Sequence, residues 1–253
     1  MTRRPRLALL AMVLAVILSG CVGGLIWSED PTGEEVKGDT LAAMDGVETY
    51  TFNATLQVDP GSSGIPVAAM ARASGAVDTR NERLRSTLSD PIRGETQTYI
   101  DGDTVYINDS ETGWTSRQLE TNYFTTKTVI DDHRALLKGA EVEHEGTEEI
   151  DGRTVNVLAV SVDNASVESH LEKLLGESNA SAFAADTGGI LENVTVETAT
   201  IRYYTGQKDD LLYRVTVTGT FRSAGQTVSA TLQMDFDDYN EELAIDIPPQ
   251  ATE

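Results

Sequence analysis

The stretch "VETYTFNATLQV", residues 47–58, decides the fold class because apolar and polar side chains alternate along it. Tyr50, Phe52, Ala54, Leu56 and Val58 share one parity, and threonine, asparagine and glutamine fill the other. Alternation with a period of two is typical of a β-strand that has one face in a core and one in water. We therefore predict a half-buried strand here, with Asn53 on its wet face.

The same alternation continues along most of the chain. Asp-Gly pairs at 101–102 and 151–152 predict two hairpin turns, and three- and four-residue apolar spacings predict helices. Asn164 is the predicted N-cap of the last helix. Predicted strands cover 67–78, 82–89, the hairpin 95–109, a short strand at Trp114, a pair within 141–162, then 191–205, 211–222 and 226–238; predicted helical stretches cover 34–45, 119–137 and 164–186. Strands joined by short turns and interrupted by helices predict one antiparallel α+β domain.

The N-terminus has the layout of an export signal. Three arginines precede the unbroken apolar run 7–18, and small residues lead to Cys21, the only cysteine. Leu18-Ser19-Gly20-Cys21 resembles a lipobox, in which the cysteine becomes the lipid-bearing N-terminus. We therefore expect a signal peptide at 1–20, a lipidated flexible tether at 21–38 and a folded domain at 39–253.

An uncleaved anchor is the alternative, since residues 7–27 carry no charge and are long enough to span a bilayer. Either route leaves the domain outside the cell membrane, because arginines before the apolar run stay inside. Residues 2–7 resemble a twin-arginine signal, although the usual aromatic after the arginine pair is missing, so the twin-arginine and general secretory routes both stay open.

The formal net charge is -22, and removing residues 1–20 makes it more negative, because three arginines and no acids leave. Such a chain repels itself unless molar salt shortens the screening length to about 3 Å. Acid-rich, lysine-poor composition therefore indicates a halophile, and we expect an archaeal source. The same charge argues against a nucleic-acid partner.

Five Asn-X-Ser/Thr sequons are candidate N-glycosylation sites on an exported chain. They are Asn53, Asn108, Asn164, Asn179 and Asn193. With a single cysteine, the fold relies on its core and not on internal disulfides.

The order of these parts resembles the LolA-like lipoprotein superfamily, which includes LolA and LolB carriers and LppX/LprG-type lipoproteins. The resemblance covers roughly residues 39–250 and is carried by "TYIDGDTVYINDSETGW" (98–114), "EEIDGRTVNVLAV" (148–160) and "FDDYNEELAIDIP" (236–248). It implies a strongly curved antiparallel β-sheet, an incomplete barrel, with helices covering the concave face. It also implies an apolar space between sheet and helices that holds an acyl chain or a lipidated partner.

The residues alone leave two readings open: an ordinary filled core, or a core with a lipid cavity. The candidate hydrophobic-ligand lining consists of large apolar or aromatic residues expected to point inward. These are Tyr50, Phe52, Leu56, Met70, Tyr106, Trp114, Leu232, Met234 and Phe236.

The sequence contains no pattern that favours catalysis. His133, His144 and His170 show no metal-ligand spacing, no Gly-x-Ser-x-Gly elbow or phosphate loop occurs, and paired aspartates follow from the acidic composition. We expect no catalytic residue, no metal and no cofactor. The resulting hypothesis is a membrane-anchored, non-enzymatic lipoprotein that binds a lipid or the acyl part of another lipoprotein. The alternative is a cell-surface sensor that uses the same scaffold to bind a protein partner, and an unrecognised hydrolase is a weaker third.

Overall fold

A computed structural model describes residues 30–59, 69–90, 94–126, 128–175, 195–223 and 226–252. The described residues from 31 onward belong to one unit, Pro31–Glu253. Cys21, Asn179 and Asn193, like the signal peptide and the first half of the tether, lie outside the described residues.

In the described residues, eleven strands form one antiparallel sheet in the order β6-β5-β4-β3-β2-β1-β11-β10-β9-β8-β7. The strands are β1 (Thr49–Asp59), β2 (Ala69–Asp78), β3 (Arg83–Asp90), β4 (Gly94–Asp101), β5 (Thr104–Asp109), β6 (Gly113–Gln118), β7 (Glu141–Ile150), β8 (Arg153–Ser161), β9 (Thr195–Gly206), β10 (Leu212–Ser223) and β11 (Gln226–Asp237). The two ends of the strand series meet in the middle of the sheet, where β1 pairs with β11. The predicted α+β class, with a curved and open antiparallel sheet, is confirmed.

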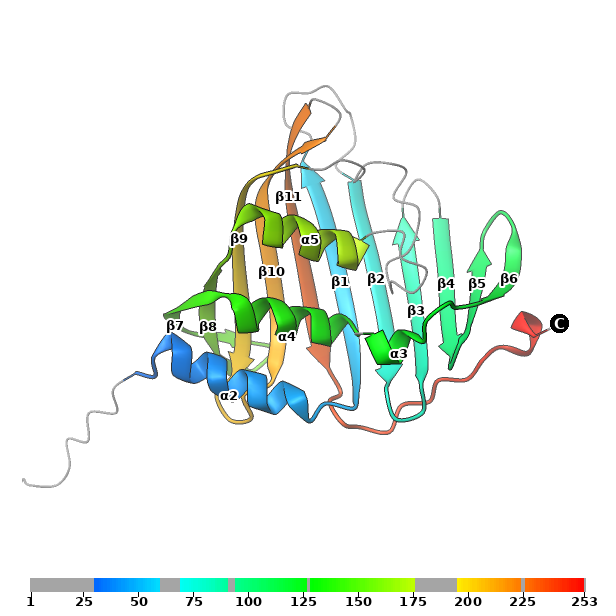
Figure 1. Cartoon of the computed structure of the whole chain (residues 1–253), viewed down its shortest axis with the longest axis horizontal. Coiled ribbons are helices and arrows are strands. Elements are labelled where there is room, and N and C mark those ends of the chain that lie inside the picture. The colour runs from blue at the N-terminus through cyan, green and yellow to red at the C-terminus, as the bar shows by residue number, and fades with distance from the viewer. Residues whose placement is uncertain are drawn as a thin grey trace, which may run out of the picture. The chain divides into compact units, whose positions relative to one another are not determined.

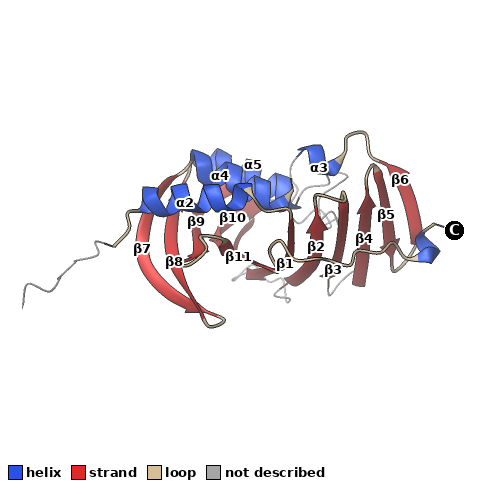
Figure 2. Ribbon diagram, turned by 90° about the horizontal axis from the view of Figure 1, so that it is seen from below, coloured by secondary structure: helices blue, strands red, loops and turns tan. Residues whose placement is uncertain are grey.

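The topology explains why helices lie on one face. β6 and β7 follow each other in sequence but occupy opposite edges, so the chain must cross the sheet between them. It does so through α3 (Tyr123–Thr126) and α4 (Val129–Gly139), and α5 (Asn164–Leu175) and α2 (Gly33–Asp45) lie on the same side. Figure 2 shows the sheet bending toward these helices at both ends, so we call the helix side the concave face.

The folded unit begins earlier than the predicted boundary at residue 39. Thr32 caps α2 through a reciprocal box with Glu35: the Glu35 backbone N–H donates to the Thr32 hydroxyl, and the Thr32 backbone N–H donates to the Glu35 carboxylate at 2.9 Å. The expectation of a flexible tether up to residue 38 is therefore wrong over its last residues, because Gly33 and Gly38 both lie inside α2.

The other helices also differ from expectation in their ends. The stretch 119–137 contains two helices, since Thr128 and Asp131 form a second capping box that starts α4. At α5 the cap is Asp163 and not Asn164, because the Asp163 carboxylate accepts from the Ser166 backbone N–H at 2.9 Å. The Asn164 side chain instead donates to the Val196 carbonyl, which ties the helix start to β9.

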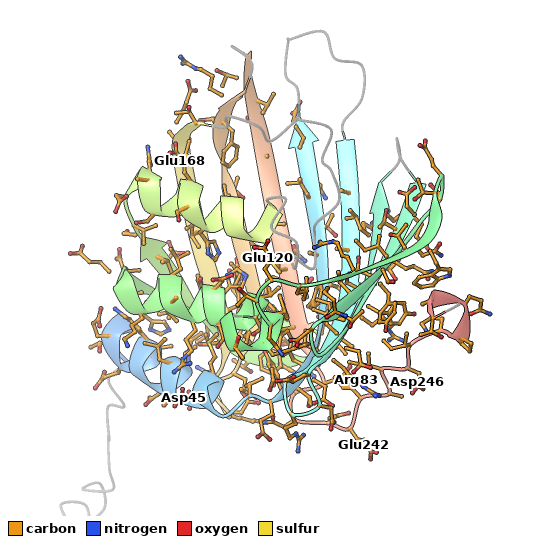
Figure 3. The ribbon with its side chains drawn as sticks, turned by 45° about the vertical axis from the view of Figure 1, so that its right-hand side comes forward. Asp45, Arg83, Glu120, Glu168, Glu242 and Asp246 are labelled. Carbon is orange, nitrogen blue, oxygen red and sulfur yellow. The ribbon has the colours of Figure 1, made fainter. Side chains whose placement is uncertain are left out.

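After β11 the chain runs as an irregular segment toward the β6 edge, ending in η1 (Pro249–Ala251), which contacts β5 and β6. Arg83 fastens this segment by donating to the Ile245 carbonyl at 3.2 Å; Figure 3 shows Arg83 beside the segment that carries Asp246. Arg83 also pairs with Asp101 of the neighbouring strand β4. The C-terminal segment therefore braces the β4–β6 end of the sheet.

Two glycines give a paired stability prediction. A Cβ at Gly38 meets no described atom within 4 Å, whereas a Cβ at Gly75 would lie 2.4 Å from the Phe52 ring and 2.7 Å from the Arg85 carbonyl. Gly38→Ala should raise the free energy of unfolding by about 0.5–1 kcal/mol, because alanine restricts the unfolded chain and favours helix. Gly75→Ala should lower it by about 1–3 kcal/mol through overpacking. Urea unfolding in molar salt measures both, and equal signs would contradict the packing described here.

Candidate functional site

The concave face is apolar because, in each strand from β1 to β5 and β8 to β11, every second residue points to it and most of these residues are apolar. Pairing carries this parity across the sheet, since register-paired side chains share a face. One such row runs Tyr203, Val215, Met234, Ala54, Ala73 and Leu88 across β9, β10, β11, β1, β2 and β3. The strand pattern predicted from residues 47–58 thus extends over the whole sheet.

The opposite face of the sheet carries cross-strand ion pairs instead. Arg214 pairs with Asp235, Arg222 with Glu197, and Arg202 with Glu145. Each of these exposed or half-exposed pairs stabilises the fold by at most about 1 kcal/mol. Over the described residues the two faces of the sheet therefore differ in chemistry, since apolar side chains continue from strand to strand on the concave face and these ion pairs lie on the other.

Six of the nine predicted lining residues share the concave face. Tyr50, Phe52, Met234 and Phe236 are almost fully buried, Leu232 is 5% exposed, and Leu56 is half-buried against the core. They come together because β1 and β11 pair in register, with Phe52 opposite Phe236 and Leu56 opposite Leu232. Met70 pairs in register with Gln57, which alternates along β1 with the residues of the concave face, so Met70 does not occupy a concave-face position of β2. Its side chain lies outside the described residues.

Tyr106 and Trp114 are wrong as lining residues. Ile100 and Val105 pair on the concave face, so Tyr99 and Tyr106, which pair one residue along, lie on the other face, as does Trp114. There the Tyr99 and Trp114 rings pack with their centroids 5.9 Å apart. Residue size alone suggested the inward direction, but the smaller Val105 and Ile107 hold the inner positions of this hairpin.

Burial on the concave face changes along the strands. The row Tyr50, Val77, Leu84, Ile100 and Val105, at one end of β1–β5, is at most 1% exposed. Further along the same strands Ile107, Leu88 and Leu56 are only half-buried against the core. Between them the face carries the small residues Ala54, Ala73 and Ser86. The described face therefore passes from a filled core into partly accessible apolar surface.

A pair of histidines lies where helices α4 and α5 meet above the sheet. The His170 Nε2 and His133 Nδ1 atoms are 3.2 Å apart, and the two residues are 4% and 0% exposed. The His133 Nε2 atom lies 3.3 Å from the Met234 Sδ atom, and the ring makes edge contacts with Tyr203 and Phe236. Below, we call His133 and His170 the histidine pair.

The hydrogen bonds around His133 engage both of its ring nitrogens. The Tyr203 hydroxyl donates its one proton to the His133 carbonyl oxygen at 3.1 Å, and a single proton bridges His170 Nε2 and His133 Nδ1, with one ring donating and the other accepting. The His133 Nε2 atom faces the weakly accepting sulfur of Met234. Burial, with the nearby His170 as a smaller cause, lowers the pKa of His133 well below its usual value.

A tyrosine hydroxyl joins the same core to the start of α4. The Tyr50 hydroxyl accepts from the Ile130 backbone N–H at 3.4 Å, so it satisfies one free donor of the first helical turn. Burial raises the pKa of both Tyr50 and Tyr203 well above the usual range. Both phenols therefore stay neutral and serve as hydrogen-bonding anchors for the helices.

The histidine pair was not predicted from the sequence. The spacing of the histidines argued against a metal site but did not indicate that His133 and His170, 37 positions apart, lie in contact. A weak signal was present, since each lies on the apolar side of a helix, His133 four residues before Leu137 and His170 three after Val167. His144, the third histidine, lies on β7 opposite Leu158.

Within the described ranges no group of three or more His, Cys, Asp or Glu side chains is arranged to hold a metal ion. No described helix has the length and apolar character required to span a bilayer. Among the sequons that the structure describes, Asn53 is exposed on β1, Asn108 is half-buried on β5, and Asn164 is exposed at the start of α5.

Comparisons with known structures agree with this architecture. LprF from Mycobacterium bovis aligns with 86% of this chain and 99% of its own at 11% identity and a TM-score of 0.52. The lipoprotein LppX from Mycobacterium tuberculosis aligns with 83% of this chain and 96% of its own at 13% identity and a TM-score of 0.49. MucB of Pseudomonas aeruginosa, in its complex with MucA, aligns with 85% of this chain and 60% of its own at 11% identity and a TM-score of 0.39.

At these identities the likeness concerns the fold alone, and we rest it on LprF. The expected LolA-like, LppX/LprG-like fold is confirmed. No curated protein matches the sequence. A sequence profile of DUF6612, a family of unknown function, matches residues 88–253, which is more than half of the chain. The chain therefore belongs to the DUF6612 family.

Proposed function

We propose that this protein is an exported lipoprotein, anchored to the outer side of the cell membrane through Cys21, whose concave face binds a hydrophobic ligand without catalysis. The ligand class is a membrane lipid or the acyl part of another lipoprotein. One observation carries the proposal: apolar side chains continue along β1–β5 beyond the filled core and remain half-buried at Leu56, Leu88 and Ile107. Water contact with such a surface is unfavourable by about 25 cal/mol per Å², so an apolar occupant would stabilise it.

The chemistry of the described face supports a binding role over a catalytic one. Its aromatic and imidazole groups are neutral and engaged: Tyr203 donates to the His133 carbonyl, and His133 contacts His170 and Met234. These groups orient helices over the sheet. Ala54 and Ala73, in the same cross-strand row as Met234, are buried. An acyl chain would therefore lie beyond them, against the half-buried Leu56, Leu88 and Ile107.

A matched pair of variants tests ligand binding. Leu88 and Thr87 are neighbours on β3, but Leu88 shares the concave face with Ala73 and Thr87 faces the other way beside Gln97. Leu88→Glu should lower the lipid that co-purifies from the host membrane at least about tenfold, because a carboxylate beside an acyl chain costs more than about 1.4 kcal/mol. Thr87→Glu should leave it unchanged. Native mass spectrometry and lipid extraction provide the measurement.

The same preparation separates the alternative function. If the protein carries no lipid in either variant but retains a protein partner after lipid removal, the sensor function replaces the carrier function. If Leu88→Glu and Thr87→Glu lose lipid equally, binding does not occur on the concave face. Washing the membranes with salt and without detergent removes electrostatically bound protein. The lipid that then co-purifies with the protein is membrane-derived.

A further inference from the structure

The histidine pair forms a direct contact between two of the helices that cover the concave face. His133 belongs to α4 and His170 to α5, and α5 also packs on β9. The Glu168 carboxylate of α5 accepts a hydrogen bond from the Val196 backbone N–H at 2.8 Å, which fixes the helix to the start of β9. Figure 3 labels Glu168 on α5. The joint between α4 and α5 thus depends on ring atoms that can change protonation.

The surroundings of His133 disfavour a charged ring. A single proton bridges His133 Nδ1 and His170 Nε2, and the Tyr203 hydroxyl, 3.4 Å from the same Nδ1, donates to the His133 carbonyl. A second ring proton would place a charge among Met234, Phe236 and Tyr203, which carry no negative charge to pair with it. A buried unpaired charge costs several kcal/mol, so the contact would have to open.

The elements around His133 contribute no described ion pair to it. α5 presents His170, β9 presents the neutral phenol of Tyr203, β11 presents Met234 and Phe236, and β1 presents Tyr50, whose hydroxyl accepts from Ile130. On α4 itself Asp131 and Asp132 precede His133 and Arg134 follows it. Arg134 pairs with Asp131 and, on α2, with Asp45.

We propose that the histidine pair is an acid-sensitive latch, which holds α4 and α5 together over the concave face and releases them when His133 takes up a second ring proton. The latch is a property of the protein without ligand. Its consequence, that acid uncovers the apolar surface and releases or admits a ligand, rests on the proposed function.

The direction of the pH effect follows from proton linkage. In the closed state the pKa of His133 lies well below 6.5, and in the open state it returns to about 6.5. The open state therefore binds the extra proton first as the pH falls below about 6.5. Opening becomes about fivefold more favourable over the first pH unit below 6.5, approaches about tenfold per unit further down to the closed-state pKa, and does not depend on this group well above 6.5.

Hydrogen exchange of the purified folded protein, without ligand and in molar salt, measures this opening. After correction for the intrinsic pH dependence of amide exchange, peptides of α4 and α5 should lose about fivefold in protection between pH 6.5 and 5.5. Peptides of β1, β10 and β11 should keep theirs. Most carboxylates stay ionised in this range, which limits the change to histidines.

Two variants identify the responsible ring. His133→Phe keeps an aromatic ring beside Phe236 but cannot titrate, so protection of α4 and α5 should become independent of pH even if its starting value falls. His144→Gln removes a histidine on β7 and should retain the wild-type response. Constant α4 and α5 protection in the wild type, or a response that His144→Gln abolishes, would overturn the latch; the wild-type measurement decides even if His133→Phe does not fold.

A separate arm tests the link to the ligand. Lipid-loaded protein should release lipid to acceptor vesicles faster at pH 5.5 than at pH 7, in parallel with α4 and α5 opening. Acid-dependent opening with no lipid bound at any pH would retain the latch and reject the proposed function. Lipid binding without acid-dependent opening would retain the proposed function and reject the latch.

Discussion

Replacing Phe236 with alanine should lower the free energy of unfolding by about 3–5 kcal/mol, since the change removes a buried aromatic ring and leaves a cavity. Phe236 is 2% exposed in β11 and lies opposite Phe52 in the central β1–β11 pair. Its ring contacts Tyr50, with centroids 6.1 Å apart, and His133, with centroids 5.7 Å apart. One side chain thus joins the two central strands to α4.

Urea unfolding in molar salt, followed by circular dichroism, measures this effect. Thr55→Ala in β1 provides the control, because Thr55 lies on the opposite face and should change the free energy by no more than about 0.5 kcal/mol. Phe236→Leu should recover part of the loss by refilling the space. A Phe236→Ala effect as small as that of Thr55→Ala would mean that the β1–β11 centre is not the core.

The largest expected cellular effect comes from Cys21→Ser. If Cys21 carries the lipid, as the sequence predicts, this variant should move the protein from the membrane to the soluble or secreted fraction. The reason is quantitative: each buried methylene of an acyl chain contributes about 0.8 kcal/mol, and two chains hold a protein stably at a bilayer. Fractionation with immunoblotting measures the distribution, and mass spectrometry of the N-terminal peptide shows whether it starts at Cys21 with added lipid.

Ser28→Ala, outside the four-residue motif that ends at Cys21, should leave the protein in the membrane fraction and serves as the control. The uncleaved-anchor alternative makes the opposite prediction. If Cys21→Ser remains in the membrane and its N-terminal peptide still contains residues 7–20, then the apolar run itself is the anchor. The folded domain would occupy the same side in both cases, so the concave-face experiments keep their meaning.

Local chemistry in the sequence was sufficient to predict most elements. Alternation at residues 47–58 predicted β1, and the Asp151-Gly152 turn is confirmed, with both residues at positive φ. In the other hairpin the turn residues are Gly102 and Asp103, because Asp101 still pairs with Thr104. Period-two patterns and turn residues depend only on neighbours in the chain, which is why they can be read from the sequence.

In the shorter strands it was harder to predict which face of the sheet each side chain points to. In β5 the residues Val105, Tyr106 and Ile107 are all apolar or aromatic, so composition does not say which parity faces inward. The register through Leu84, Ile100 and Val105 decides it, and this register follows from pairing with β3 and β4. A one-residue ambiguity in parity reverses the face of every side chain, which moved Tyr106 and Trp114 out of the predicted lining.

The sequence by itself determined the class of the domain, its strands and helices, and the expectation of a lipid attachment site at Cys21. Only the tertiary structure decided that β1 pairs with β11, and that the chain crosses the concave face between β6 and β7. This crossing, followed by α5, brings His133 against His170. Contacts between residues far apart in sequence depend on how the whole sheet and its helices pack around the core, and no local sequence pattern encodes that packing.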